Sequence, residues 1–248
     1  MNFWRRGKLR LATALKLDLT HPQVHYARFL QSHTRDVSTW LDIGCGRQII
    51  PPDKMSEDEQ KRSFGNIPLL VGVDVDEAIL QHQVINARVI ALCPPLPFRS
   101  GSFDLVTANM VIEHVQDPAS FLREVHRVLR PGGSFIFHTP NSRYYLIFIA
   151  RLTPEWAKHK IVWYLEGRRE ADIFETHYHM NTPEDIINFA AANKFEVVEL
   201  ALNGGDGTFG RLGPVGWLEC FLLKLVASIK SGRYNSNLIV QLRKRTAN

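Results

Sequence analysis

Trp40-Leu41-Asp42-Ile43-Gly44-Cys45-Gly46 has the pattern of an apolar strand that ends in an Asp-x-Gly-x-Gly turn. Glycines at such a turn let the backbone bend sharply and approach a ligand, with main-chain amides facing it. A second apolar run, Leu69-Leu70-Val71-Gly72-Val73-Asp74, also ends in an acid. In a doubly wound sheet Asp74 would lie beside the glycine turn, where its carboxylate can accept both hydroxyls of a ribose.

Outward from these two strands, short apolar runs alternate with helical patterns, which predicts an α/β fold with a doubly wound, mostly parallel sheet. A helix over 118–128 should stop at Arg130-Pro131-Gly132-Gly133, and another should begin at Thr182-Pro183 and run to about Asn193. Residues 47–68 contain Pro51-Pro52 and a charged run, and we expect an irregular segment there. The expected strands are 39–43, 69–73, 88–91, 103–108, 134–139, 195–202 and 237–242.

Two stretches break this rhythm, and we expect both to be insertions at one edge of the sheet. An N-terminal helical segment, 1–36, should precede a domain over 37–248 with insertions at about 143–178 and 203–235. The first insertion is rich in Tyr, Trp and Arg, and we expect a helical cap. Such a cap could close over a ring or sugar carrying negative charge or a lipid-linked one, or its aromatic residues could form its own core.

Composition indicates a soluble globular protein, with 45% hydrophobic and 22% charged residues. The net charge of +5 gathers at two basic ends, 5–16 and 243–245, so the first segment could rest on an anionic membrane or be a solvated helix. The three cysteines lack disulfide or zinc spacing, which favours the cytoplasm. The apolar runs 144–150 and 217–229 are too short or too interrupted to span a bilayer, so membrane contact would be peripheral.

A nicotinamide-binding fold would share the strand, glycine turn and acid, but it needs a third glycine to bring a helix close to the pyrophosphate. Here Arg47 follows Gly46, and Asp42 would repel a pyrophosphate. An acid at this point suits a cationic ligand, such as one that carries an ammonium and a sulfonium.

Six segments in register resemble the successive motifs of class I S-adenosylmethionine-dependent methyltransferases. The resemblance covers about Val37 to Asn141 and implies a seven-stranded sheet whose last strand runs antiparallel, with S-adenosylmethionine at the carboxyl ends of the first strands. The six segments are Leu41-Asp42-Ile43-Gly44-Cys45-Gly46, Val73-Asp74, Leu96-Pro97-Phe98, Ser102-Phe103-Asp104-Leu105-Val106, Glu113-His114-Val115 and Arg127-Val128-Leu129-Arg130-Pro131-Gly132-Gly133.

The resemblance also implies which residues bind the cofactor. Asp42 would lie near its ammonium and Asp74, followed by Val75, would hold its ribose. The family often places an acid before its Leu-Pro-Phe motif to bond the adenine, but Leu92 stands there in this chain. The remaining predicted contacts are Gly44, Cys45 and Gly46 on the methionine part, Leu92 and Cys93 beside the adenine, and Asn109 and Met110 near the sulfonium.

Three histidines are candidates for acid-base or acceptor-binding roles. His114, just after the fourth strand, is the best placed base, although it could instead pack at a helix start. Some quinone O-methyltransferases resemble this segment but carry Glu-x-x-Glu-His, which can hold a metal; Met110 replaces the first acid, so no metal is expected. His177 and His179 flank Tyr178 on the side where the family binds its acceptor.

The function that we expect is methyl transfer from S-adenosylmethionine to a small-molecule acceptor, with O-methylation of a sugar, phenolic or lipid-linked compound ahead of others. Nucleic-acid methylation is the alternative, but the fourth strand ends in Ala108-Asn109-Met110-Val111 and not in the Asn/Asp-Pro-Pro-aromatic turn of many enzymes that methylate amino groups of nucleic acids. A further alternative is a catalytically inactive protein of the same fold that binds the cofactor or a partner.

Overall fold

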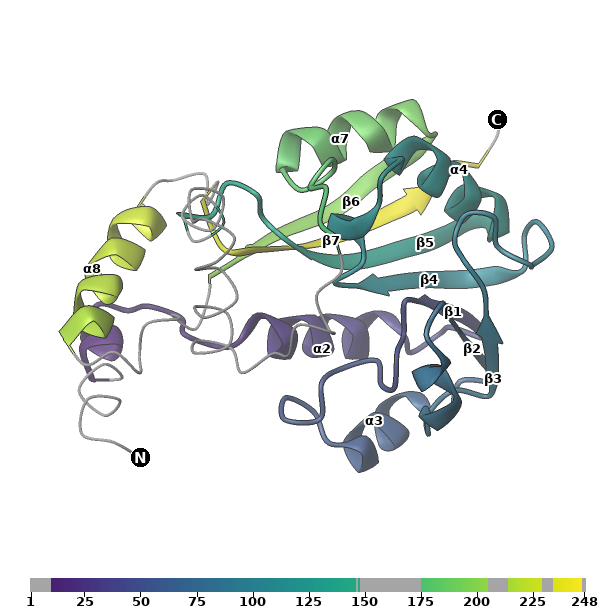
Figure 1. The fold of residues 1–248 in the computed structure, drawn as a ribbon, viewed down its shortest axis with the longest axis horizontal. Coiled ribbons are helices and arrows are strands. Elements are labelled where there is room, and N and C mark those ends of the chain that lie inside the picture. The colour runs from purple at the N-terminus through teal and green to yellow at the C-terminus, as the bar shows by residue number, and fades with distance from the viewer. Residues whose placement is uncertain (1–9, 146, 148–174, 205–213, 229–233, 247–248) are drawn as a thin grey trace. The chain divides into compact units, whose positions relative to one another are not determined.

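The computed structural model describes residues 10–145, 147, 175–204, 214–228 and 234–246 (Figure 1). Within these residues one seven-stranded sheet has the strand order β3-β2-β1-β4-β5-β7-β6. The strands are β1 Thr39–Ile43, β2 Leu69–Asp74, β3 Ala87–Ile90, β4 Phe103–Asn109, β5 Leu129–Pro140, β6 Phe195–Asn203 and β7 Asn237–Lys244. The helices are α2 Pro22–His33, α3 Glu57–Phe64, α4 Pro118–Val128, α7 Pro183–Ala192 and α8 Pro214–Ser228, with 3-10 turns η1 Glu77–Gln81 and η2 Ile112–His114.

The first five strands pair in parallel, so their carboxyl ends meet at one edge of the sheet. In the register, Asp42 lies opposite Gly72 on one side and Thr107 on the other, and Asn109 lies opposite His138. Figure 1 shows β7 pointing in the opposite direction to β4. The sheet is therefore mixed, as predicted, and the strand that reverses is the last one.

Helices cover both faces of the sheet, which confirms the doubly wound architecture. Ile136 of β5 belongs to the buried cluster that contains Tyr26 of α2 and Phe64 of α3. Phe135, the preceding residue, points to the other face because side chains alternate along a strand, and its ring lies 6.0 Å from that of Phe121 in α4. Two hydrophobic layers thus hold the strands in place.

The predicted helix starts are confirmed at their caps. Asp117 accepts a hydrogen bond from the Ser120 amide at the start of α4. Thr182 accepts one from the Asp185 amide at the start of α7. Each cap satisfies one of the amides that a helix leaves unpaired at its first turn.

The expectation of an irregular segment over 47–68 is wrong in part, because the charged run forms α3. Ser56 caps this helix, and Gln60 and Phe64 face inward. The Gln60 amide bonds the backbone of Ile50 and Met55, which holds the proline-containing loop. The charges that suggested a loop are the solvent face of a short helix.

Several strand bounds also differ from the predicted ones. β5 begins at Leu129 and not at 134, and β3 lies one residue earlier than expected. β7 extends to Lys244, whose ammonium donates to the carbonyls of His126 and Leu129 at 2.7 Å each. Part of the basic C-terminal stretch is therefore a structural cap on the end of α4.

The chain forms two compact units. The sheet unit comprises Gln23–Pro140, Thr176–Ala201 and Leu238–Asn248, and the accessory unit comprises Met1–Pro22, Asn141–Glu175 and Leu202–Asn237. Most of the two expected insertions falls in the accessory unit. Within the first of them, 148–174 lies outside the described residues, so the expected aromatic cap stays a prediction.

Candidate cofactor and acceptor site

The glycine turn after β1 leaves open space for a ligand. Gly44 and Gly46 have φ angles of 65° and 49°, in the left-handed region. A Cβ on Gly44 would lie 2.5 Å from Val111 Cγ2, whereas a Cβ on Gly46 would meet no atom within 4 Å. Packing therefore requires glycine at the first position, and the backbone at the second borders a free volume.

Asp74 joins the glycine turn to the end of β2. Its Oδ2 accepts the Gly46 amide at 2.7 Å, and its Oδ1 accepts the Asp76 amide at 2.9 Å. The side chain is half-buried. Because each carboxylate oxygen has more than one acceptor site, the group remains able to accept two hydroxyls. This is the arrangement predicted for a ribose contact.

Asp42 is a buried carboxylate, 1% exposed, beneath the same turn. Its Oδ1 accepts the Thr107 hydroxyl, which in turn accepts the Trp40 indole N–H at 2.6 Å. Its Oδ2 is buried with no hydrogen-bond partner among the described residues. Burial raises the pKa of Asp42 to about 7, although the Thr107 hydrogen bond lowers it. An unpartnered buried carboxylate oxygen favours a cationic hydrogen-bond donor as its ligand.

Tyr26 and Thr107 belong to this site, and sequence reasoning missed both. The Tyr26 ring stacks on His138 at 5.3 Å between centroids. Burial and the nearby Asp42 charge raise the Tyr26 pKa well above its ordinary value, so the hydroxyl keeps its proton. Neither residue lies in a motif, and only the fold brings them to Asp42.

Asn109 is held in a network of side-chain amides at the end of β4. It exchanges two hydrogen bonds with Gln23, of 2.9 and 3.1 Å, and donates to the Ile49 carbonyl at 2.9 Å. Its Oδ1 also lies 3.0 Å from His138 Nδ1. His138 therefore bonds Asn109 in addition to packing. Met110 follows with a φ of 58°, and the contacts of Asn109 and Met110 near the sulfonium stay predictions.

Three large apolar side chains are exposed at the ends of β2 and β3. Val75, Ile90 and Leu92 are 53%, 50% and 69% exposed. Val75 and Leu92 flank a backbone hydrogen bond of 3.0 Å from the Ala91 amide to the Asp74 carbonyl. Apolar surface next to a ribose-binding acid suits a flat aromatic base. Leu92 therefore offers apolar surface for contact with a base.

The two predicted cysteines differ in what they can contribute. Cys45 is buried, and its sulfur lies where a Cβ on Gly72 would meet it at 2.6 Å, so only its backbone can face a ligand. Cys93 is half-buried beside the predicted adenine position. Burial raises the Cys93 pKa to about 12, which keeps it a neutral thiol.

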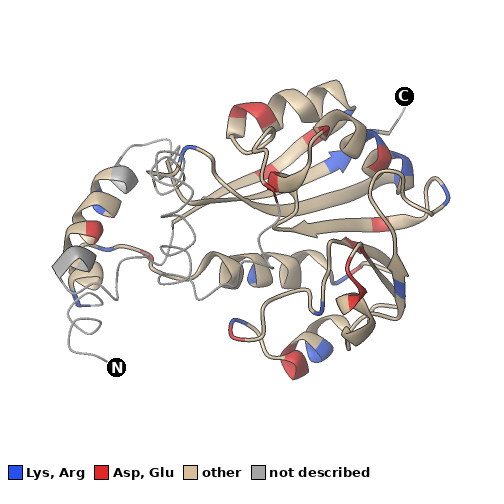
Figure 2. Cartoon of the chain, in the orientation of Figure 1, with Lys and Arg blue, Asp and Glu red and all other residues tan. Residues whose placement is uncertain are grey.

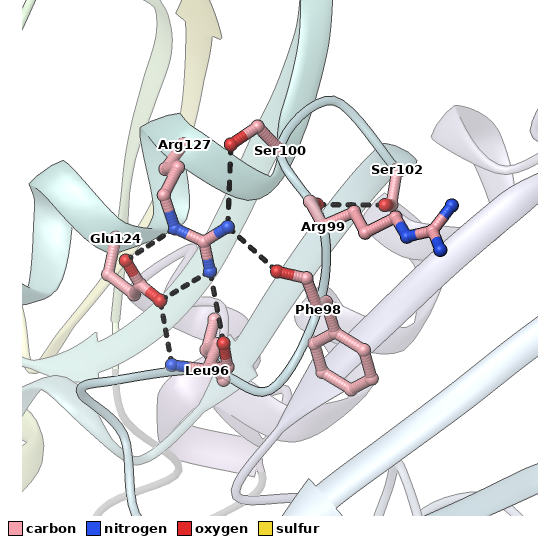
Figure 3. Close-up of polar contacts among 7 residues, drawn as sticks. All are labelled: Leu96, Phe98, Arg99, Ser100, Ser102, Glu124 and Arg127. Atoms are coloured by element: carbon pink, nitrogen blue, oxygen red, sulfur yellow. Dashed lines mark hydrogen bonds and ion pairs between the residues drawn. The ribbon is translucent and has the colours of Figure 1, made fainter.

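The loop that follows β3 is fixed by a single guanidinium (Figure 3). Arg127 of α4 donates to the carbonyls of Phe98 and Leu96 at 2.7 and 3.0 Å. Glu124, paired with Arg127 at 2.6 Å, accepts the Leu96 amide at 2.7 Å. Two of the motifs quoted above, Leu-Pro-Phe and the one that begins at Arg127, thus hold each other through these contacts.

The three predicted histidines come from two stretches of the chain that are hydrogen-bonded to each other, η2 and residues 177–179. The carbonyl of Glu113 accepts the amide of His177 at 2.7 Å, and His179 Nδ1 lies 2.9 Å from the Gln116 carbonyl. The rings of His177 and His179 are 5.6 Å apart, and His114 is half-buried in η2 between these contact points. The structure therefore brings all three candidates together after β4.

Glu113 is part of the support for this segment. Its side chain is 3% exposed and accepts the Thr139 hydroxyl at 3.0 Å, and Thr139 accepts the Asn181 amide at 2.6 Å. Within the described residues no group of three His, Cys, Asp or Glu side chains could hold a metal ion. The site therefore consists of hydrogen-bonding and apolar groups.

The groups gathered at this site fit S-adenosylmethionine. Asp42 offers a buried oxygen for a cation, Asp74 offers acceptors for two hydroxyls, and Gly46 leaves room for the backbone to approach. Val75 and Leu92 offer an apolar surface for the base. The ammonium, the ribose and the base of this cofactor thus each have a matching group at the carboxyl ends of β1, β2 and β3.

Known proteins support the same assignment. A model of a methyltransferase domain family matches residues 21–200. A ubiquinone biosynthesis O-methyltransferase of Pseudomonas paraeruginosa is 35% identical over 112 residues, which cover 42% of this chain and 44% of that protein. A protein with the same name from Xanthomonas oryzae pv. oryzae is 30% identical over 127 residues, which cover 48% of this chain and 53% of that protein. This chain spans about half the length of the curated relatives that it matches.

A solved structure shows the same fold. The S-adenosylmethionine-dependent methyltransferase of Methanosarcina mazei superimposes with a TM-score of 0.55 at 17% identity, over 88% of this chain and 98% of that one. The family match covers well over half of the chain. This chain therefore belongs to the methyltransferase domain family, as a class I member whose cofactor is S-adenosylmethionine.

Proposed function

We propose that this chain transfers a methyl group from S-adenosylmethionine to a hydroxyl of a small-molecule acceptor, such as a sugar, phenolic or lipid-linked compound. Two observations support an oxygen acceptor. The curated relatives named above are O-methyltransferases. The structure gathers three histidines after β4, and a hydroxyl, unlike an amine or a thiolate, benefits from a base.

The observation that carries the proposal is the Asp74 carboxylate, which accepts the Gly46 amide next to open space. When bound, the cofactor supplies a methyl group on a sulfonium, which is strongly electrophilic. Asp74 binds the ribose, and Asp42 binds the ammonium through its unpartnered oxygen. Val75 and Leu92 cover the base. These contacts fix the donor and leave alignment of the acceptor to the segment after β4.

His114 is the proposed base. As the new O–C bond forms, the proton of the acceptor hydroxyl passes to an imidazole nitrogen of His114, so that no charged oxonium builds up. His177 and His179 lie alongside and bind the acceptor.

Turnover assays test the proposal. The protein is incubated with methyl-labelled S-adenosylmethionine and a panel of catechols, sugars and quinol precursors, and label in the organic product is measured. We expect transfer to at least one hydroxylated acceptor and a loss of about 10²–10⁴-fold in His114→Ala. His25→Ala, a half-buried histidine of α2, serves as the control.

The pH dependence separates a base from a packing residue. If His114 takes the proton, the activity of the wild type falls at acidic pH with a limb that His114→Ala lacks. Equal activity of the two proteins at all pH values would contradict the role of His114. Cofactor binding without transfer to any acceptor would favour the catalytically inactive alternative.

A further inference from the structure

Helix α8 of the accessory unit turns its apolar residues outward. Five large hydrophobic side chains are exposed at helical spacing on one face, with Lys224 as the exposed charged residue among the described side chains of the helix: Trp217, Leu218, Phe221, Leu222 and Leu225. Leu218 and Leu225 are 69% and 67% exposed. The charged residues of α8 are the buried Glu219 and the exposed Lys224. Figure 2 shows the rest of the helix in tan or grey, so α8 has few of the charges of an ordinary surface helix.

The inward face of the same helix carries a buried acid beside Cys220 and Leu223. Glu219 is 3% exposed and accepts the Tyr145 hydroxyl at 2.8 Å, and Cys220 is fully buried. Rotating α8 to bury its apolar face would expose this bond and break it. The hydrogen-bonded acid therefore fixes the orientation, and the outward apolar face is built into the unit.

Charge divides unevenly between the two units. The accessory unit contains 15 basic and 8 acidic residues in its sequence, whereas the sheet unit contains 15 and 17. All of the excess positive charge of the chain thus belongs to the unit that carries α8. A second copy of such a unit would be repelled, whereas an anionic surface would be attracted.

Lys16, at the end of the basic N-terminal stretch, lies near α8. One cavity of about 240 Å³ within the accessory unit is lined by residues 16–19 and by Leu223 of α8. Lys16 is exposed. An exposed lysine of the N-terminal stretch is therefore close to the inward side of α8. None of the helices that the structure describes is long and apolar enough to cross a membrane.

We propose that α8 docks this protein on an anionic lipid bilayer, lying in the plane of the interface with Leu218, Phe221 and Leu225 among the acyl chains. The length of α8, 15 residues, suits an interfacial helix, because a span needs about 20 apolar residues. Apolar burial and attraction of the basic unit to anionic headgroups act together. This inference does not depend on which acceptor is methylated.

Co-sedimentation with vesicles tests it, using the full chain. Vesicles of phosphatidylcholine alone are compared with vesicles that contain an equal amount of phosphatidylglycerol. We expect the wild type to sediment with the anionic vesicles and to be released by salt in part, because screening weakens only the electrostatic attraction. Leu218→Glu and Phe221→Glu should each weaken binding by at least about tenfold.

Ile187→Glu is the matched control, because Ile187 is an exposed apolar residue of α7 in the sheet unit, 50% exposed. It should bind vesicles like the wild type. Thermal melting checks that the α8 variants are folded, independently of cofactor binding. No sedimentation of the wild type, or an equal loss in Ile187→Glu, would overturn the proposal. A dimer in sedimentation velocity that Leu218→Glu dissociates would also overturn it, because α8 would then be a self-association face.

Discussion

Helices α4 and α8 both carry large apolar side chains, but α4 buries most of them and α8 exposes most of them. α4 buries Phe121, Leu122 and Val125 against the sheet and exposes Arg123. α8 buries Glu219 and exposes Phe221. The sheet unit thus follows the rule that apolar side chains point inward, and the accessory unit departs from it along one helix. The buried apolar residues of α4 stabilise the fold, whereas the exposed apolar residues of α8 are available for contact with something outside the protein.

The largest effect on stability should come from the buried face of α4. Phe121 is 1% exposed, and its ring contacts that of Phe135, so Phe121→Ala leaves a cavity. We expect a loss of about 3–5 kcal/mol in the free energy of unfolding, measured by urea denaturation. Arg123→Ala on the exposed face of the same helix should change it by less than about 0.5 kcal/mol. Equal effects would break the comparison.

Each unit also contains a buried carboxylate, Glu219 in the accessory unit and Asp42 in the sheet unit, and the two differ in their hydrogen bonds. Glu219 accepts a hydrogen bond from Tyr145, whereas Asp42 has a raised pKa and an oxygen with no partner. Because the folded protein holds a proton on Asp42 up to about pH 7 and the unfolded chain releases it near 3.8, stability falls as pH rises between these values. Below about pH 3.8 the contribution of Asp42 to stability no longer changes with pH.

Asp42→Asn keeps an acceptor for Thr107 and removes this titration. At pH 8 we expect the variant to be about 4 kcal/mol more stable than the wild type in the absence of cofactor, with the difference shrinking towards pH 4. Denaturation at several pH values measures it. A difference that does not depend on pH would show that Asp42 is not protonated in the fold.

Arg127 should have an intermediate effect, within the sheet unit. Its removal leaves the carbonyls of Leu96 and Phe98 without this donor and takes one of two donors from the Glu124 carboxylate, all in partly buried positions. Arg127→Ala should cost about 1–3 kcal/mol, and Arg127→Lys should recover only part of it, because an ammonium lacks the guanidinium's forked geometry. Denaturation of the two variants alongside Arg123→Ala provides the measurement.

The smallest effect on stability should come from the exposed face of α8. Leu225→Ser removes a side chain that is 67% exposed, so the free energy of unfolding should change by less than about 0.5 kcal/mol. Urea denaturation in the absence of lipid measures it. A loss as large as that in Phe121→Ala would mean that this face is covered in the folded protein, and the contrast between the two helices would disappear.

Much of the fold could be predicted from the sequence, because its signals are local. The glycine turn, the acid after β2, and the Thr182 and Asp117 caps each depend on residues a few positions apart. α3 could not be predicted in this way. Its charged run shows no apolar periodicity, and what fixes it is Gln60, whose amide bonds a loop 10 residues away.

The site was predictable only in part, for the same reason. Asp74 and the glycines lie in motifs, but Thr107 reaches Asp42 across 65 positions and Gln23 reaches Asn109 across 86. The outward face of α8 could not be decided from the sequence, because the helical spacing of the apolar residues in 217–229 fits packing as well as membrane contact. Tertiary contacts decide which side of such a helix is buried.

The central claim is that the carboxyl ends of β1 and β2 bind S-adenosylmethionine through Asp74, and calorimetric titration tests it most directly. The wild type, Asp74→Ala and Asp58→Ala, which changes an exposed acid of α3, are titrated with S-adenosylmethionine and S-adenosylhomocysteine. We expect dissociation constants of the order of micromolar for the wild type and Asp58→Ala, and at least about tenfold weaker binding for Asp74→Ala. Absence of binding by the folded wild type, or undiminished binding by Asp74→Ala, would contradict it.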